Sequence, residues 1–100
     1  MESCGVPTKT ILQTTILQTL GDEVRKRREG RHLTQEKLAL EVGVHTNAIG
    51  RLERGETDSR VLTLFDIAMG LETPLADLIA GVERRGHEWK DGDNQAERLI

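Results

Sequence analysis

The chain has 100 residues, of which 36% are apolar and 31% charged, enough for one small domain with a modest core. Phe65 and Trp89 are its only aromatic residues, so the core has to be aliphatic, which favours helices over strands. The single cysteine, Cys4, excludes an internal disulfide, and no stretch of ~18 apolar residues predicts a membrane span. Because a signal-peptide pattern is also absent, we expect a cytoplasmic protein.

The net charge of −3 argues weakly against a nucleic-acid partner, but the charge is unevenly distributed. Residues 61–100 carry four basic and eight acidic side chains, whereas residues 21–60 carry nine basic and eight acidic ones. Residues 25–28, with the sequence RKRR, lie in the second group. From charge alone, this run is either a local positive surface or an ordinary solvated helix face.

Residues 1–19 are interpreted as an N-terminal extension. Residues 1–9 lack periodicity and contain Gly and Pro, so we expect a loose tail there. Residues 10–19 repeat the sequence TILQT twice, and their β-branched content is typical of a strand. We favour a helix because apolar residues recur every four positions, at Leu12, Ile16, Leu20 and Val24. Such an apolar face needs a covering surface, either on the domain itself or on a second copy.

A first helix is expected over residues 20–29, followed by a second helix after Thr34. Threonine is a good N-cap, because its hydroxyl accepts a hydrogen bond from a free N–H of the first turn. The expected buried face of this second helix consists of Leu38, Ala39 and Val42. Gly43 should end it, because glycine tolerates the left-handed conformation of a tight helix exit.

The third expected helix begins after a cap at His45 or Thr46, runs to about Arg54 and ends at Gly55. Ile49 and Leu52 are three residues apart and should face inward. Two helices joined by a turn of this length have the spacing of a helix-turn-helix motif.

Two further helices complete the expected all-α domain over residues 20–81. The fourth covers residues 61–71, with an inward face formed by Val61, Leu64, Phe65, Ile67, Ala68 and Leu71. Thr73 as N-cap and Pro74 at the first helical position predict a short fifth helix, closed by Gly81, whose inward residues are Leu75, Leu78 and Ile79. Residues 82–100 are read as a polar, acidic C-terminal tail.

The segments LTQEKLALEVGV, AIGRLERGE, TLFDIAMGL and PLADLI together resemble the lambda-repressor/Cro-like (XRE-type) helix-turn-helix family over about residues 20–81. The resemblance implies a five-helix DNA-binding domain, here with N- and C-terminal extensions. It also implies a transcriptional regulator that binds double-stranded DNA, usually a dimeric repressor that reads a palindromic operator through the helix at residues 45–54. No cofactor or metal is expected, since no Cys/His set has zinc-finger spacing.

The resemblance further implies which residues meet DNA. Those that match the base-facing positions of the recognition helix are Thr46, Asn47, Gly50 and Arg51. Those that match phosphate contacts are Thr34, Gln35, His45 and Arg54. These residue types suit the chemistry, because Asn can bond adenine N6 and N7 together, Arg can bond guanine O6 and N7, and a helix N-terminus favours a phosphate. Arg28 and Glu53 match positions that form a buried ion pair in some family members.

Three residues depart from the family pattern. Gly50 stands where Ser or Thr is usual, His45 replaces the usual Ser or Thr cap, and His32 stands where glycine is common, so we expect His32 to be left-handed. Plainer alternatives also exist: Asn47 would only assist the helix cap, and Arg51 would meet only phosphate or solvent.

An alternative function within the same fold is an antitoxin-type interaction protein, which binds a partner protein and represses its own operon. Its docking surfaces would be residues 10–19 and the acidic C-terminal forty residues, 61–100. An enzyme is not expected, because the sequence has no phosphate loop, no metal-ligand set and no nucleophile with a base at useful spacing.

Overall fold

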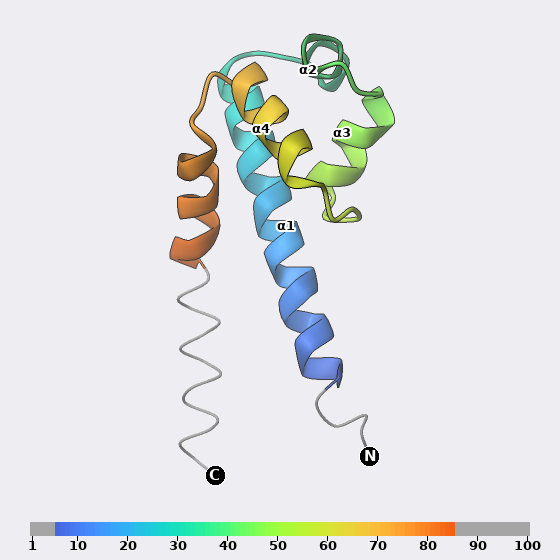
Figure 1. Ribbon diagram of the computed structural model, residues 1–100, viewed down its shortest axis with the longest axis vertical. Helices are drawn as coiled ribbons and strands as arrows, with labels where there is room; N and C mark the ends of the chain where they lie inside the picture. The colour runs from blue at the N-terminus through green and yellow to red at the C-terminus, as the bar shows by residue number, and fades with distance from the viewer. Residues whose placement is uncertain (1–5, 86–100) are drawn as a thin grey trace.

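The computed structural model describes residues 6–85, with side chains from residue 12 onward. Over this range the chain forms helices and no strand, which confirms the all-α prediction. α1 spans Val6–Gly30, α2 Gln35–Val42, α3 Thr46–Glu53 and α4 Val61–Gly70. A fifth helix begins at residue 75 and continues through residue 85. Figure 1 shows α1 as the long axis of the molecule, with α2, α3 and α4 gathered around its C-terminal half.

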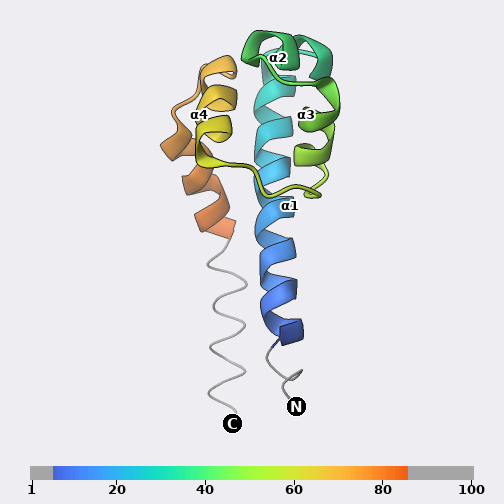
Figure 2. The same ribbon diagram turned by 45° about the vertical axis from the view of Figure 1, so that its right-hand side comes forward.

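α1 is one continuous helix of 25 residues. The TILQT repeat is therefore helical, as favoured, and no break separates it from residues 20–29. Residues 6–9 also belong to α1, although the sequence predicted a loose tail there. Pro7 is compatible with this start. The N–H groups in the first turn of a helix have no acceptor within the helix, so a proline there loses no hydrogen bond. The N-terminal half of α1 projects beyond the other helices (Figure 2).

The ends of α2 are formed by the residues that the sequence predicted. The Thr34 hydroxyl accepts a hydrogen bond from the Lys37 N–H at 3.0 Å. Gly43 is left-handed, with φ of 85°, and its N–H bonds to the carbonyl of Ala39. His32 in the preceding connection is also left-handed, with φ of 59°, as expected for a position where glycine is common.

The core is aliphatic, as the composition predicted. α2 packs against both α3 and α4, and α1 packs against α3. The largest fully buried side chains come from all five helices and from the C-cap residue of α4: Leu38, Ile49, Leu52, Ile67, Leu71, Leu78 and Val24.

α4 buries a narrower face than predicted. Ile67, Ala68 and Leu71 are buried, but Val61 and Phe65 are 63% and 49% exposed, so their inward assignment was wrong. The physical reason is that α4 is apolar on nearly every side, and periodicity then does not identify the buried face.

The fifth helix is longer than predicted. Gly81 does not end it: Gly81 is buried inside the helix, where an added Cβ would lie 2.5 Å from Cδ of Glu23 in α1. The missing side chain lets the two helices approach closely. Val82, assigned to the tail, is only 8% exposed and belongs to the core, whereas Ile79 is 38% exposed. Residues 86–100 of the predicted tail lie outside the described residues.

Candidate nucleic-acid interface

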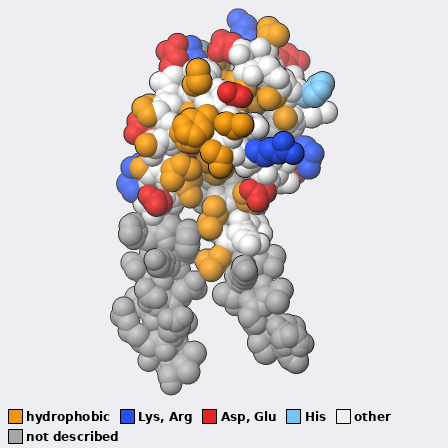
Figure 3. All heavy atoms as spheres, viewed as in Figure 1, with side chains coloured by type: hydrophobic (Ala, Val, Ile, Leu, Met, Phe, Trp, Pro, Cys, Tyr) orange, Lys and Arg blue, Asp and Glu red, His pale blue; other side chains and the backbone are white. Residues whose placement is uncertain are grey.

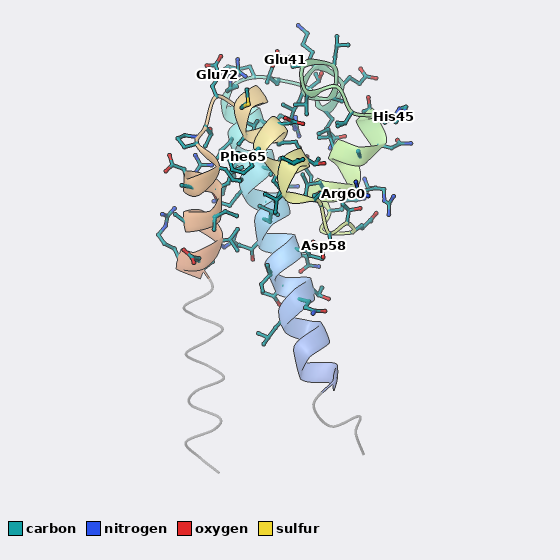
Figure 4. The ribbon with its side chains drawn as sticks, viewed as in Figure 1. Glu41, His45, Asp58, Arg60, Phe65 and Glu72 are labelled. Atoms are coloured by element: carbon teal, nitrogen blue, oxygen red, sulfur yellow. The ribbon has the colours of Figure 1, made fainter. Side chains whose placement is uncertain are left out.

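The two sides of α3 differ as the sequence predicted. Ile49 and Leu52 are 0% and 1% exposed and anchor the helix to the core. Thr46, Asn47 and Arg51 are exposed on the other side. Asn47 and Arg51 are four residues apart and therefore project from the same side of the helix. Figure 4 places His45, at the start of α3, on the outer edge of the molecule.

The exposed side chains of α3 are available to a ligand. Among the described residues, neither Asn47 nor Arg51 forms a side-chain hydrogen bond or ion pair. His45 occupies the N-cap position of α3 without a side-chain cap bond. The first N–H groups of α3 therefore lack a capping side chain, which favours an anion at this end of the helix.

Gly50, which was predicted to face base edges, is covered by other side chains in the structure. It is buried, and an added Cβ would lie 3.2 Å from Nη1 of Arg54 and 3.4 Å from Oε1 of Gln35. Gly50 therefore lies beneath these two side chains. Its missing side chain leaves space for both of them to cross α3.

Arg28 and Glu53 form the buried ion pair that the resemblance implied. Arg28 Nε lies 2.6 Å from Glu53 Oε2, and Nη2 lies 3.1 Å from Oε1. Arg28 Nη1 also donates to the Leu33 carbonyl at 2.7 Å. The hydrogen bond with Glu53 raises the pKa of Arg28, against the opposing effect of burial. This pair joins α1 to the last turn of α3.

Gln35 extends the ion pair to the start of α2. Its Nε2 donates to Glu53 Oε1 at 2.9 Å. One carboxylate thus binds both the Arg28 guanidinium and the Gln35 amide. The side chain of Gln35 is held against α3 at the N-terminus of α2, where a phosphate contact was expected.

Arg54 has a partner that the sequence analysis missed. Its Nε and Nη2 donate to the Glu56 carboxylate at 2.9 and 3.2 Å. The pairing lowers the pKa of Glu56 and raises that of Arg54. The turn at Gly55, with φ of 74°, lies between the two residues, and the Arg-Gly-Glu spacing alone did not predict their contact. The Arg54 guanidinium, which was expected to bind phosphate, is therefore hydrogen-bonded to the Glu56 carboxylate in this structure.

The basic run at residues 25–28 does not form a single positive surface. Arg28 is buried against Glu53, Arg27 lies 3.5 Å from Glu23, and Arg25 lies 3.6 Å from Asp22. Most of its charge is thus paired locally. This favours the solvated-face interpretation over an extended binding surface.

Other kinds of site find no support in the part of the chain that the structure describes. Between residues 6 and 85, no three His, Cys, Asp or Glu side chains are grouped so as to hold a metal ion. Within the same range, no helix combines the length and apolar character needed to cross a bilayer.

The comparisons with known proteins agree on one family. Residues 24–78 match the helix-turn-helix family model HTH_3. Over 65 residues the chain is 37% identical to an uncharacterized transcriptional regulator in the ATPase CF(0) region of Rhodospirillum rubrum, and the match covers 65% of this chain and 60% of that protein. Over 74 residues it is 34% identical to Control protein C.SmaI of Serratia marcescens, with 74% and 88% covered. The chain thus spans about three-fifths of the first relative and most of the second.

The fold is similar to that of a solved controller protein. The crystal structure of the restriction-modification controller protein C.AhdI from Aeromonas hydrophila superposes with a TM-score of 0.61 at 27% identity. The superposition covers 62% of this chain and 94% of that one. The shared part is therefore nearly the whole of the smaller protein.

Proposed function

Because the chain belongs to the HTH_3 family of XRE-type helix-turn-helix DNA-binding transcriptional regulators, we propose that it is a sequence-specific repressor that binds double-stranded DNA as a dimer. The observation that carries this proposal is the outward face of α3, where Asn47 and Arg51 are exposed and unpaired among the described residues. The family is one of regulators and not an enzyme class.

In the proposed complex, α3 enters the major groove, which is wide enough for a helix. Thr46, Asn47 and Arg51 face the base edges, and a bidentate Asn or Arg contact distinguishes one base from the others. Phosphates bind at the start of α2, through Thr34 and Gln35, and around α3, through His45 and through Arg54, whose guanidinium exchanges Glu56 for the phosphate. These contacts fix the position of α3, and the base contacts provide the selectivity.

The anchoring of Gln35 supports this arrangement. Its amide is held by Glu53, whose carboxylate is itself held by Arg28. A phosphate-binding side chain that is already oriented loses less conformational entropy on binding than a mobile one. The same buried pair thereby supports both the fold and the DNA-binding surface.

Dimeric binding would match a palindromic operator. Two copies related by a two-fold axis present two α3 helices to half-sites one helical turn apart, ~34 Å along the duplex. Occupancy of such a site within a promoter would exclude RNA polymerase. The regulatory names of the relatives, a transcriptional regulator and a control protein, support a regulatory role.

Selection of binding sequences from a random DNA pool tests the proposal, at a stated salt concentration of about 150 mM because phosphate contacts make affinity salt-dependent. We expect enrichment of a palindrome whose two arms carry the bases read by Asn47 and Arg51. Enrichment of a single, non-repeated site would contradict dimeric reading. No enrichment by folded protein would instead favour the antitoxin-type interaction protein, and co-purification with a partner would then be sought.

A further inference from the structure

α4 carries an apolar surface that the core does not use. Val61, Leu62, Phe65 and Met69 are 63%, 76%, 49% and 74% exposed. We refer to these four residues as the α4 surface. Figure 3 shows hydrophobic side chains gathered over α4 at the centre of this face of the molecule. Monomeric proteins rarely expose large contiguous apolar patches, which usually mark an interaction site.

Opposite charges flank the α4 surface. Arg60, the N-cap residue of α4, forms no ion pair with any described residue. A groove of about 370 Å³ lies toward the other end of α4, lined by Glu41, Val42, Asp66, Met69 and Gly70. Asp66 is also without an ion pair in the described chain, and Glu41 lies 3.9 Å from Arg31. In Figure 4, Arg60 lies below and Glu41 above the height of Phe65, and Phe65 lies to one side of both.

We propose that the α4 surface binds the α4 surface of a second copy of this chain, with Arg60 of each copy in the acidic groove of the other. A two-fold interface is made by the same patch on both copies. A contact between two different residues therefore occurs twice, once in each direction across the axis. A patch with an apolar centre, a cation at one end and acids at the other is complementary to itself in that arrangement. The inference rests on the proposed function as a dimeric regulator and names the surface that forms the dimer.

The position of α3 is compatible with this interface. Figure 1 shows α3 at the side of the molecule, whereas Figure 3, in the same view, shows the apolar side chains facing the viewer. Pairing through the α4 surface therefore leaves the outward face of α3 uncovered. A two-fold axis that lies in the plane of this surface and points toward α3 brings both α3 helices to one side of the dimer, where they can bind the same duplex.

The charge pairing allows a test by exchange. Sedimentation velocity of the full chain at tens of micromolar is expected to show a dimer. Arg60→Glu and Asp66→Lys should each weaken self-association by about tenfold or more, because each places like charges together at both ends of the interface. An equimolar mixture of the two variants should restore the dimer. In the mixed dimer, one junction pairs the introduced glutamate with the introduced lysine, and the other keeps Arg60 with Asp66.

Asp58→Lys is the matched control, because Asp58 is exposed near Arg60 but does not line the groove. Asp58→Lys alone should dimerise like the wild type, and in its mixture with Arg60→Glu the Arg60→Glu copies should stay largely monomeric. All three substitutions change exposed residues, and circular dichroism would verify that each variant is folded. Phe65→Glu provides a second route to the monomer, by placing a charge in the apolar centre.

Each contrary result has a defined meaning. A monomeric wild-type chain, a dimer that persists in Phe65→Glu, or restoration by Asp58→Lys instead of Asp66→Lys overturns the interface. If the protein enriches a palindrome but its dimer is unaffected by these substitutions, only the proposed interface is overturned. If mixing the two charge variants restores the dimer as expected but the protein enriches no DNA sequence, the interface stands and the proposed function is overturned.

Discussion

Arg28 and Glu53 are 25 residues apart in the chain, and their side chains form a two-point ion pair at 2.6 and 3.1 Å. Both side chains are nearly inaccessible, at 11% and 3% exposed. The pair lies between the first helix and the end of α3, and it also holds Gln35. We therefore expect both stability and DNA binding to depend on one carboxylate.

Replacing that carboxylate alone should strongly destabilise the fold. Glu53→Gln leaves the buried Arg28 charge with only the exposed Glu29 carboxylate, 3.9 Å away, and we expect the free energy of unfolding to fall by roughly 3–5 kcal/mol. The double variant Arg28→Met/Glu53→Leu should lose much less, because no uncompensated charge remains. Urea denaturation of both variants measures the difference. A loss in Glu53→Gln of only ~1 kcal/mol or less would mean that the pair behaves like an exposed one.

Gln35→Ala should weaken DNA binding without changing sequence preference. Its expected partner is a phosphate, which is the same at every base pair. The affinity for the selected operator and for unrelated DNA should fall by similar factors, and the salt dependence of binding should become slightly shallower. Fluorescence anisotropy titrations over a salt series measure both. A change in the preferred bases would instead place Gln35 in base recognition.

The elements determined by local interactions could be predicted from the sequence. Thr34 and Gly43 mark the ends of α2 because capping depends on only a few neighbouring residues. The buried positions Leu38, Ile49 and Leu52 follow from helical periodicity in segments with one apolar side and one polar side. The outward face of α3 could be predicted by the same rule, as the complement of Ile49 and Leu52.

Features that depend on contacts between distant segments could not be predicted in this way. Gly50 looks outward by periodicity, and only the tertiary structure places Gln35 and Arg54 over it. Gly81 looks like a helix end, but its neighbour is Glu23 of α1, 58 positions earlier in the chain. Phe65 and Val61 were assigned to the core because the α4 segment is apolar throughout, and nothing local distinguishes a core face from an interaction face.

Arg51→Ala should change selectivity as well as affinity. If Arg51 binds a guanine edge through two hydrogen bonds, its loss should weaken operator binding by ~1–3 kcal/mol and relax selectivity at one position in each half-site. Repeating the random-pool selection with the variant measures this directly. An equal loss on every sequence, with an unchanged motif, would make Arg51 a phosphate contact.

Glu56→Gln should strengthen DNA binding. The Glu56 carboxylate occupies Arg54 through two hydrogen bonds, and its pKa is lowered, so it stays ionised at neutral pH. Neutralising it frees the guanidinium for a phosphate and removes a negative charge beside the duplex. The gain should appear on all sequences and should vanish in the Arg54→Ala background. A gain that persists without Arg54 would be a general charge effect.

Gly21 and Gly30 provide a paired test of how α1 docks on α3. An added Cβ at Gly21 would lie 2.5 Å from the carbonyl oxygens of both Leu52 and Glu53, whereas one at Gly30 would meet nothing within 4 Å. Backbone atoms at the end of a buried helix have little freedom to move aside. Both glycines lie in α1, so the intrinsic preference for alanine favours both substitutions.

Gly21→Ala should therefore lower the free energy of unfolding by ~1–3 kcal/mol through overpacking, despite the better helix propensity of alanine. Gly30→Ala should be neutral or slightly stabilising, since only propensity changes there. Thermal and urea denaturation of the two variants side by side separate the effects. Because the clash lies against Leu52 and Glu53, Gly21→Ala should also shift the end of α3 and weaken operator binding in the fraction that remains folded. Equal stability of the two variants would mean that α1 does not approach α3 as closely as these distances require.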